Sequence, residues 1–588
     1  MHSRDLDHPT AALTAASGAH LDSIYAAHLR DKPDACALID PQGVTMTYAA
    51  LEQRVQAATQ WLADHGVTRG DRVAVWLINQ PEWLVLFFAL ARLGATLVAV
   101  NTRFRSHELQ YILSRSQARM LIMQPGFRKL DFPEIVAGVD PAELPDLRVV
   151  VVLATEADAT DTQAEPAPRI LNRPVLAYAP GAGGRAATTA AADAKSATAH
   201  ASEASTVEHA ASNVASVPAS SAQVPTESRA DLPVVLFTTS GTTKGPKLVV
   251  HTQRTISGHS HNVKRAFGMG QPGDSLLAAL PFCGVFGLNS VLGALAAGQP
   301  IVMLDVFNAD DAIEALLKHG STHLFATDEM LRRIAERWPD GKRASLRLVG
   351  FAAFSPGAED LAQLMADKGF PLAGVYGSSE VMALFSYQLP SLPVSERTLG
   401  GGTPASPDAI VRIRNPETGE LCAPDEAGEI EIASPTNFVG YLNNPEATAE
   451  AIMSDGFFRT GDLGYLRRDG SFVYLSRMGD AMRLGGFLVN PTEIEYAITL
   501  FDGVQDAQVV AVEMEGRLRP VAFVLADDSA PGAQAMIDSL TQTLAPFKVP
   551  ARIWVVDAFP TTASANGLKF QRVKLRDMAL LRLADETA

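Results

Sequence analysis

A loop rich in hydroxyl groups and lysines is the first chemical feature of the sequence. Residues 236–252 read LFTTSGTTKGPKLVVHT, with apolar runs on both sides of the polar segment. Backbone N–H groups in such a loop can point at phosphate oxygens, the hydroxyls add donors, and Lys247 adds positive charge. The loop is not a Walker loop, because Gly241 and Gly245 are four apart and Lys247 leads into a strand-like run. We expect a phosphate contact here, the alternative being a surface hairpin turn.

Four more motifs follow along the chain, and each holds charged or hydroxylated residues. They are YGSSE at 376–380, FRTGDLGY at 458–465, SRMGDAMRLGGFLVNPTEIE at 476–495 and NGLKFQR at 566–572. Taken alone, each has a plain structural explanation, such as a turn with a helix cap, a surface arginine or a solvated lysine. Their common order in one chain is what makes them informative.

Alternating helix-like and strand-like patterns must position these motifs. Within residues 45–125, TYAALEQRVQAATQWLADHG has apolar positions at helical spacing and DRVAVWLI is a short buried strand, and PEWLVLFFALARLG and ATLVAVN repeat the pattern. Such alternation predicts a mostly parallel sheet covered by helices. It resumes at Leu232 and continues to about residue 400.

Changes of composition divide the chain into an α/β body of residues 20–477 and an α+β C-terminal domain of residues 478–588. Within the body, residues 409–475 have short strands such as AIVRIR, GEIEIAS and SFVYLS between turn signals, which predicts a β-rich subdomain. Residues 154–230 are dominated by Ala, Ser, Thr and Glu, so we expect a low-complexity, flexible surface insertion.

Composition and charge exclude several classes of protein. Of the 588 residues 47% are apolar and 19% charged, which is typical of a globular chain with a large core. With 49 Lys and Arg against 65 Asp and Glu, the net charge of −16 disfavours nucleic acid and anionic lipid as partners. Cys36, Cys283 and Cys422 are too far apart for a disulfide framework or a structural zinc site, and a reducing cytoplasm fits best.

Two apolar stretches, 83–100 and 276–304, resemble membrane spans. Arg92, several glycines and prolines interrupt them, so we expect buried core instead. The N-terminus has no apolar run after its charges and does not resemble a secretory signal.

The five motifs, in this order, resemble those of the adenylate-forming superfamily of acyl- and aryl-CoA synthetases, luciferases and peptide-synthetase adenylation domains. The resemblance covers nearly the whole chain except about the first 20 residues and 154–230. It implies stacked, mostly parallel sheets in the body and a small, mobile C-terminal domain. It also implies that a carboxylate attacks the α-phosphorus of MgATP, giving an acyl-adenylate and pyrophosphate, and that a thiol then gives a thioester and AMP. Such chemistry needs positioning and electrostatics rather than a protein nucleophile, and the motifs hold no Ser-His-Asp arrangement.

The resemblance assigns roles in nucleotide binding. In YGSSE, Tyr376 matches a residue that packs against adenine, Ser379 replaces a threonine near the α-phosphate, and Glu380 matches a magnesium ligand, a task that suits a carboxylate. Gly377 and Ser378 belong to the same nucleotide-binding segment. The residues that match the loop over the β- and γ-phosphates are Thr239, Ser240, Gly241, Thr242, Thr243 and Lys247.

Three charged residues complete the expected site. Asp462 matches the carboxylate that accepts hydrogen bonds from both ribose hydroxyls, and Arg477 matches an arginine that contacts the nucleotide. Lys569 resembles the lysine that contacts the substrate carboxylate and the α-phosphate, where a cation would stabilise developing charge. The spacer in NGLK is one residue longer than is common, which leaves Lys574 as an alternative.

Three glycines are expected to serve the second step, in which the thioester forms. Gly485 and Gly486 match the face that lets the pantetheine arm of CoA pass close to the backbone. Gly479 stands at the hinge position, where Asp or Lys is usual, and we expect an easier but less well-defined domain rotation.

The acyl pocket is expected at 281–289, 351–355 and 381–385. These segments are apolar, without Lys or Arg, which favours an uncharged aliphatic or aryl acid and disfavours amino acids. Gly284 stands where many relatives have a His or an aromatic residue. The pocket residues are Phe282, Gly284, Phe286, Ala352, Ala353 and Met382.

These features predict an acid:CoA ligase with ATP and CoA as co-substrates and Mg²⁺ as cofactor. Two alternatives stay open: an acyl-AMP ligase that loads a separate carrier protein, and a non-catalytic acyl- or nucleotide-binding relative. We further expect a role in fatty acid metabolism, a cytoplasmic location, and a homodimer as one possible assembly.

Overall fold

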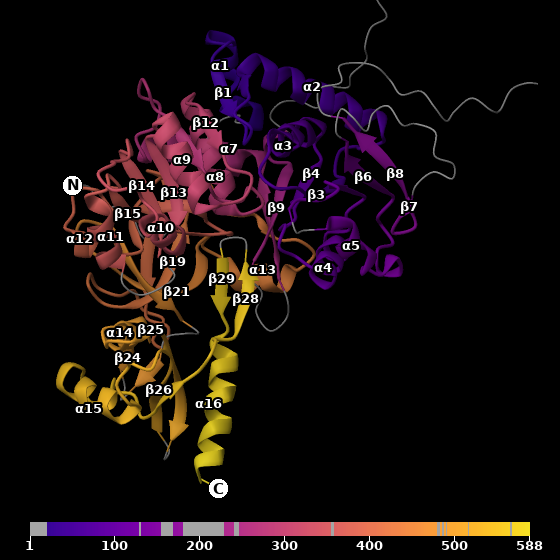
Figure 1. Cartoon of the computed structure of the whole chain (residues 1–588). Helices are drawn as coiled ribbons and strands as arrows, with labels where there is room; N and C mark the ends of the chain where they lie inside the picture. Colours follow the sequence, from indigo (N-terminus) through magenta and orange to yellow (C-terminus); the bar gives the residue numbers. More distant parts are fainter. Residues whose placement is uncertain are drawn as a thin grey trace, which may run out of the picture.

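The computed structural model describes residues 20–128, 131–154, 169–179, 229–239, 246–353, 358–478, 482–484, 487–489, 491–514, 517–564 and 567–587. Figure 1 shows a large body above a smaller C-terminal domain, coloured yellow-orange. The expected α/β architecture, with large N-terminal sheets and a small α+β domain, is confirmed.

Among the described residues, nine strands form one sheet of the body. The order is β20 (Gly440–Tyr441), β10 (Leu248–Thr252), β9 (Pro233–Thr238), β4 (Thr96–Ala99), β3 (Arg72–Trp76), β5 (Met120–Met123), β6 (Val149–Leu153), β8 (Arg173–Tyr178) and β7 (Arg169–Ile170). From β9 to β8 the neighbouring strands are parallel, as the alternation of helix-like and strand-like patterns predicts.

Thirteen described strands form the second sheet. The order is β18 (Ile410–Arg414), β19 (Gly428–Ala433), β21 (Phe458–Leu466), β22 (Phe472–Arg477), β17 (Gly401–Pro404), β16 (Met382–Tyr387), β15 (Leu372–Ser378), β14 (Leu348–Ala352), β13 (His323–Thr327), β11 (Leu276–Ala278), β12 (Ile301–Met303), β1 (Cys36–Ile39) and β2 (Thr45–Thr47). Its segment from β1 to β15 is parallel, and the rest is antiparallel. The β-rich segment at 409–475 therefore continues a large sheet through the pairing of β17 with β22.

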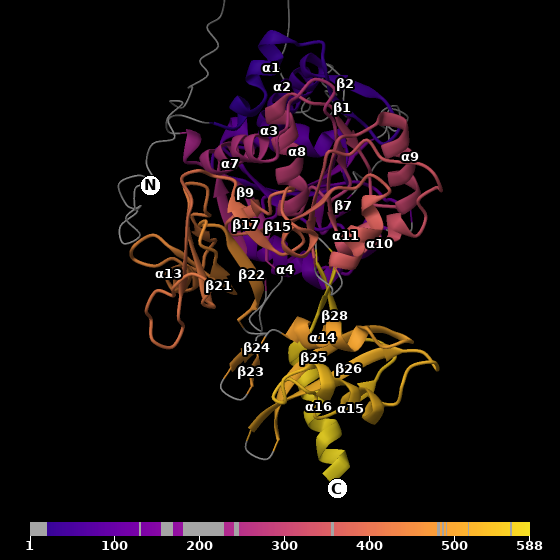
Figure 2. The same cartoon turned by 90° about the vertical axis from the view of Figure 1, so that its left-hand side faces the viewer.

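Helices pack on and between these sheets (Figures 1 and 2). The described helices of the body are η1 (Leu21–Ile24), α1 (Ala26–Asp31), α2 (Tyr48–Asp64), α3 (Pro81–Leu93), α4 (Ser106–Ser116), α5 (Phe132–Ala137), η2 (Pro141–Glu143), α7 (Gln253–Ala266), α8 (Val285–Ala297), α9 (Ala309–His319), α10 (Asp328–Ala335), α11 (Ala358–Ala366), α12 (Val394–Arg397) and α13 (Pro445–Ala451). Nearly all of α3 and all of α8 are buried, which confirms that the two apolar stretches are core. No helix in the described part is long and apolar enough to cross a membrane.

One part of the segment expected to be a flexible insertion belongs to the fold. Residues 169–178 form β7 and β8, and β8 pairs in parallel with the edge of β6. The run RPVLAY supplies β-branched and aromatic residues, and β6 offers an unpaired edge. The expected insertion at 154–230 is therefore wrong for this stretch, while 155–168 and 180–228 lie outside the described residues.

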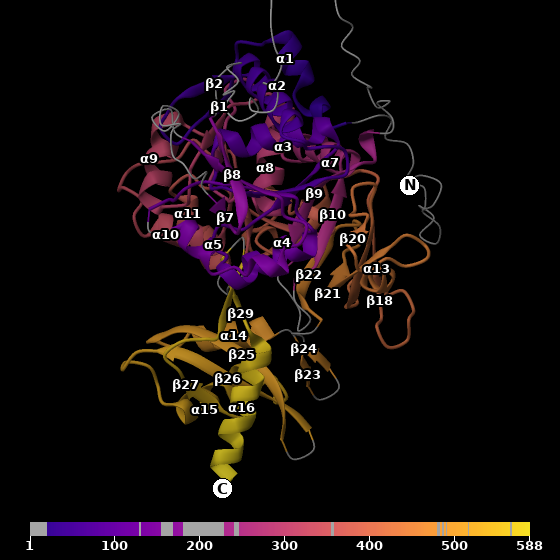
Figure 3. The same ribbon diagram turned by 90° about the vertical axis from the view of Figure 1, so that its right-hand side faces the viewer.

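The C-terminal domain has two small cores of its own around β25 and β26. Its strands are β23 (Met482–Leu484), β24 (Phe487–Val489), β25 (Val504–Met514), β26 (Arg517–Ala526), β27 (Ile553–Val555), β28 (Thr561–Ser564) and β29 (Gly567–Phe570), and its helices are α14 (Pro491–Thr499), α15 (Ala533–Thr543) and α16 (Arg572–Thr587). The hairpin of β28 and β29 projects from this domain toward the body, as Figures 1 and 3 show.

Candidate active site

Three residues from three of the motifs meet in the body. The Tyr376 hydroxyl donates a hydrogen bond to Oδ2 of Asp462 at 2.6 Å, and Nε of Arg477 lies 3.0 Å from Oδ1 of the same carboxylate. Asp462 is only 3% exposed. Burial, together with the Asp462 charge, raises the pKa of Tyr376 well above its usual value, so the phenol stays a donor.

A bulge in β21 presents Asp462. On the facing strand β19, Glu429 pairs with Leu463 while Glu431 pairs with Arg459, so residues 460–462 bulge out of the pairing with β19, while Asp462 stays paired with Arg477 of β22. Gly461 takes a left-handed conformation (φ 67°) that a side chain would strain. The hydroxyl of Thr460 holds both sides of the bulge, because it donates to the carbonyl of Ile430 and accepts from the amide of Asp462. Such bulges commonly redirect side chains at active sites.

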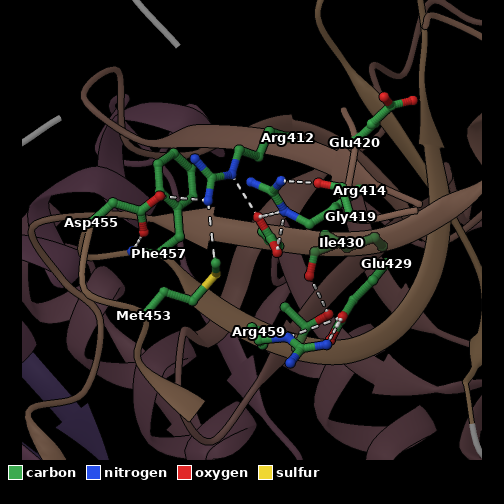
Figure 4. Close-up of polar contacts among 12 residues, drawn as sticks. Arg412, Arg414, Gly419, Glu420, Glu429, Ile430, Met453, Asp455, Phe457 and Arg459 are labelled. Atoms are coloured by element: carbon green, nitrogen blue, oxygen red, sulfur yellow. Dashed lines mark hydrogen bonds and ion pairs between the residues drawn. The ribbon is translucent and has the colours of Figure 1, made fainter. Parts of the chain in front are cut away.

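Charged side chains on β18, β19 and β21 brace this bulge (Figure 4). The fully buried carboxylate of Glu431 accepts hydrogen bonds from Arg412 at 2.6 Å and Arg414 at 3.0 Å. Next to it, Glu429 binds Arg459 at 2.6 Å and accepts the amide of Gly461 at 3.3 Å. Because a buried charge is tolerated only when it is paired, this network fixes the register of the strands that carry Asp462.

The base of the expected phosphate loop is well defined. Thr239 and Lys247 close the antiparallel hairpin of β9 and β10 through two hydrogen bonds. The amide of Thr239 donates to the Lys247 carbonyl, and the amide of Lys247 donates to Oγ1 of Thr239, both at 3.0 Å. Lys247 enters a strand, as predicted. Ser240, Gly241, Thr242 and Thr243 lie outside the described residues.

Glu380 and Lys247 converge on Tyr441, a residue that sequence reasoning missed. The Tyr441 hydroxyl donates to Oε1 of Glu380 at 2.9 Å, and Nζ of Lys247 lies 4.5 Å from the centre of the Tyr441 ring. The Asp462 charge, and to a smaller extent the Glu380 charge, raise the pKa of Arg477, so the Glu380 carboxylate lies within electrostatic reach of the first cluster. Tyr441 lies in the two-residue strand β20, and its only sequence signal is its place before an Asn-Pro helix start.

The YGSSE turn is held by its own side chains and by close packing. Oγ of Ser378 accepts the amides of Glu380 at 3.2 Å and Val381 at 3.4 Å. A Cβ on Gly377 would lie 2.4 Å from the carbonyl oxygen of Met382, so the approach of β15 to β16 requires glycine here. The carbonyl of Ser379 accepts a hydrogen bond from the buried side chain of His251.

Two buried histidines fasten the segment that follows. Nε2 of His251 donates to the Ser379 carbonyl and Nε2 of His259 to the Ala383 carbonyl, both at 2.7 Å. Between these carbonyls, Met382 adopts φ 73°, which is strained for a residue other than glycine. Burial lowers the pKa of each histidine to about 4, so both are neutral near pH 7.

Acidification is expected to destabilise the body through these histidines. The unfolded chain takes up protons below its histidine pKa of about 6.5, whereas folded His251 and His259 resist protonation down to about 4. The free energy of unfolding therefore falls as the pH drops through this window, by up to about 3 kcal/mol per histidine. Urea midpoints measured from pH 4 to 7 should depend less on pH in His259→Gln than in the parent, whereas exposed His65→Gln should behave like the parent. Identical profiles for all three proteins would contradict this expectation.

The expected acyl-pocket residues lie on neighbouring elements. Gly284 precedes α8, which packs against β16, and the amide of Asn289 on α8 donates to the Ala383 carbonyl at 3.1 Å. Phe286 and Met382 are buried, whereas Ala352 is half-buried and Ala353 is exposed. Phe282 instead faces Trp83 of α3, with ring centres 6.0 Å apart, so it packs toward the core.

The remaining predicted residues are only partly covered. The backbone of Lys569 lies in β29, paired with Thr562, but nothing is described for its side chain. Gly479, Gly485 and Gly486 lie outside the described residues.

Comparison with known proteins places the chain in a family. The sequence model of the AMP-binding enzyme family matches residues 25–442, and that of the AMP-binding enzyme C-terminal domain matches residues 493–566. The chain therefore belongs to the AMP-binding enzyme family. The class expected from its motifs, an ATP-dependent acid:CoA ligase working through an acyl-adenylate, is confirmed.

Curated relatives match nearly the full length. The chain is 28% identical to the 3-hydroxybenzoate–CoA/4-hydroxybenzoate–CoA ligase of Thauera aromatica, over 91% of this chain and 92% of that protein. It is 29% identical to the 2-succinylbenzoate–CoA ligase of Geobacillus kaustophilus (90% and 93%) and 28% identical to the feruloyl-CoA synthase of an Amycolatopsis species (90% and 93%). Among solved structures, ATP-bound MatB from Rhodopseudomonas palustris is similar with a TM-score of 0.73 at 25% identity, covering 95% of this chain and 98% of that one.

Proposed function

We propose that this ligase activates an aryl carboxylic acid whose ring carries no second ionised group. The named relatives act on hydroxybenzoate, succinylbenzoate and ferulate, all of them aromatic. The described pocket segments, 281–289, 351–353 and 381–385, hold no Lys or Arg that would pair with a second carboxylate. Hydroxybenzoate-like or ferulate-like acids therefore fit better than succinylbenzoate. The relatives give no support to a role in fatty acid metabolism.

The nucleotide binds, in this proposal, where the motifs converge. The observation that supports it most directly is the meeting of Tyr376 with Asp462 and Arg477. Tyr376 lies 86 residues before Asp462 in the sequence, and its hydroxyl donates to the buried Asp462 carboxylate that also pairs with Arg477. A carboxylate such as Asp462, with two acceptor oxygens, suits the two ribose hydroxyls. Thr239, Lys247 and the loop between them would face the β- and γ-phosphates, with Ser379 beside the α-phosphate.

Glu380 suits Mg²⁺. One carboxylate oxygen accepts the Tyr441 hydroxyl, and a second oxygen is available as the hard ligand that Mg²⁺ prefers. In the described part of the chain no three His, Cys, Asp or Glu side chains form a metal cage. This fits an ion that uses one protein carboxylate together with phosphate oxygens and water. When bound, Mg²⁺ would neutralise charge on the leaving pyrophosphate.

The chain's own residues then act by positioning and charge. The carboxylate of the acid attacks the α-phosphorus of ATP. The bond between the α-phosphorus and the oxygen that bridges it to the β-phosphate breaks, and pyrophosphate leaves. Lys569, carried on the hairpin that projects toward the body, would stabilise the charge that develops at the α-phosphate. In the second step, the CoA thiolate would pass Gly485 and Gly486 and displace AMP, after a rotation at Gly479. A cytoplasmic location and a homodimer stay predictions.

A substrate panel tests this proposal. Pyrophosphate release and thioester formation are measured with 4-hydroxybenzoate, ferulate, 2-succinylbenzoate and octanoate, each with and without CoA. We expect the highest kcat/KM for the two monocarboxylic aryl acids, with thioester only when CoA is present. Adenylate without thioester would indicate a carrier protein as acceptor, a preference for octanoate would overturn the aryl assignment, and no pyrophosphate with any acid would indicate a non-catalytic relative.

A further inference from the structure

Tyr441 lies between two oppositely charged residues that the proposed function uses together. Its hydroxyl donates to Oε1 of Glu380 at 2.9 Å, and its ring faces the Lys247 ammonium at 4.5 Å. Within the described part of the chain, Lys247 and Glu380 form no ion pair with each other. The tyrosine is thus the physical link between the phosphate loop and the carboxylate proposed to bind metal.

The surroundings fix Tyr441 in this position. It is 8% exposed, and its ring packs on Phe438 with centres 4.9 Å apart. The strand segment that carries it is bonded on both sides: the Phe438 amide donates to the Glu380 carbonyl at 2.7 Å, and the Val439 amide donates to the Val250 carbonyl at 3.0 Å. Tyr441 is therefore held between β10 and the YGSSE turn by backbone hydrogen bonds and by the packing of its ring.

The chemistry of a phenol suits this place. A phenol hydroxyl has one proton to donate, and here it donates that proton to the Glu380 carboxylate. That hydrogen bond occupies one carboxylate oxygen and orients the other. The negative face of the ring attracts the Lys247 ammonium without neutralising it. Lys247 and Glu380 both contact this one side chain. Without the phenol we expect them to pair directly, and that pair would compete with phosphates and metal for both groups.

We propose that Tyr441 is a positioning residue that keeps Lys247 and Glu380 apart and preset for MgATP. This inference rests on the proposed function and adds to it a residue outside all five motifs. Its effect belongs to nucleotide and metal binding, so it should appear in KM for MgATP and in the Mg²⁺ requirement rather than in kcat for the bound complex.

Two variants separate the hydroxyl from the ring. In Tyr441→Phe the ring stays, so we expect about tenfold weaker MgATP binding by calorimetry and a higher Mg²⁺ requirement in pyrophosphate release, with kcat nearly unchanged. In Tyr441→Leu both contacts are lost and binding should weaken by about 50-fold. Tyr25→Phe is the matched control, because that hydroxyl also donates to a glutamate, Glu52, at 2.8 Å, but is buried elsewhere in the body. It should bind MgATP like the parent.

A double-mutant cycle tests the separation itself. If Lys247 is already diverted to Glu380 in Tyr441→Leu, then adding Lys247→Ala should cost much less than it does in the parent. Additive losses would overturn this part of the inference. Calorimetry needs no acid, so the results stay distinguishable: a parent that binds no MgATP overturns the proposed function and this inference together, whereas a parent that binds while Tyr441→Phe binds equally well overturns this inference alone.

Discussion

Replacing Lys569 by alanine is expected to slow acyl-adenylate formation by about 10²- to 10³-fold. The lysine lies on β29, whose hairpin projects from the C-terminal domain toward the body, and a cation there would be preorganised for the charge that forms at the α-phosphate. Conversion of a synthetic acyl-adenylate to thioester should continue, because the proposed rotation of the C-terminal domain takes Lys569 out of the site before the second step. Single-turnover measurements of each half-reaction check this result.

Lys574→Ala is the matched control for this variant. Lys574 is exposed on α16, five residues after Lys569, and the sequence alone leaves it as the alternative cation. It should adenylate at the parental rate. If Lys574→Ala loses adenylation and Lys569→Ala does not, the assignment passes to Lys574. Equal loss of both half-reactions in Lys569→Ala would instead point to damage of the whole domain.

Asp462→Ala is expected to have the second large effect, on activity and stability together. The substitution removes the acceptor of the buried Tyr376 hydroxyl and the partner of the partly exposed Arg477 guanidinium, and leaving a buried donor unsatisfied typically costs about 1–3 kcal/mol. The proposed ribose contacts are lost as well, so MgATP binding should weaken by about 100-fold or more. Calorimetry of MgATP binding and urea unfolding measure the two effects separately.

Asp274→Ala separates stability from nucleotide binding. Asp274 is 5% exposed, pairs with Arg347 at 2.5 Å and accepts the amide of Gln271 at 2.8 Å, so its removal should also destabilise the body. It belongs to none of the motifs, and MgATP binding by the folded protein should stay parental. If Asp462→Ala is destabilised to the same extent and still binds MgATP normally, then Asp462 does not contact the nucleotide.

The sequence predicts the site best where short motifs carry the chemistry. Tyr376, Glu380, Asp462 and Arg477 could be named because each lies in a compact motif with a fixed order. The structure brings Tyr376, Asp462 and Arg477 into contact, and Glu380 into contact with Tyr441. Tyr441 could not be named, because its role arises only when β20 pairs with β10 beside the YGSSE turn. Pairings between residues so far apart in sequence leave no local pattern.

Local composition predicts the helices and the parallel strands of the body correctly, but it fails to predict the strand β8 next to the low-complexity segments. The apolar repeats at α2, α3 and β3 are long enough to determine their elements, since periodicity reports burial directly. The strand β8 lies between low-complexity stretches, and its ordering depends on the exposed edge of β6. A short strand of this kind forms because it pairs with the neighbouring strand of the sheet, and the residues before and after it in the sequence do not indicate it.

The two histidine contacts have a consequence for changing which acid the enzyme accepts. His251 and His259 clamp one short stretch of backbone at both ends, and that stretch holds Glu380 near one clamp and Met382, on the wall of the proposed acyl pocket, near the other. Remodelling the wall at Met382 would therefore displace the Glu380 carboxylate, the proposed magnesium ligand, two residues away. We expect that substrate range can be altered with less loss of ATP turnover at α8 positions other than Asn289, whose amide is bonded to the Ala383 carbonyl of the clamped stretch.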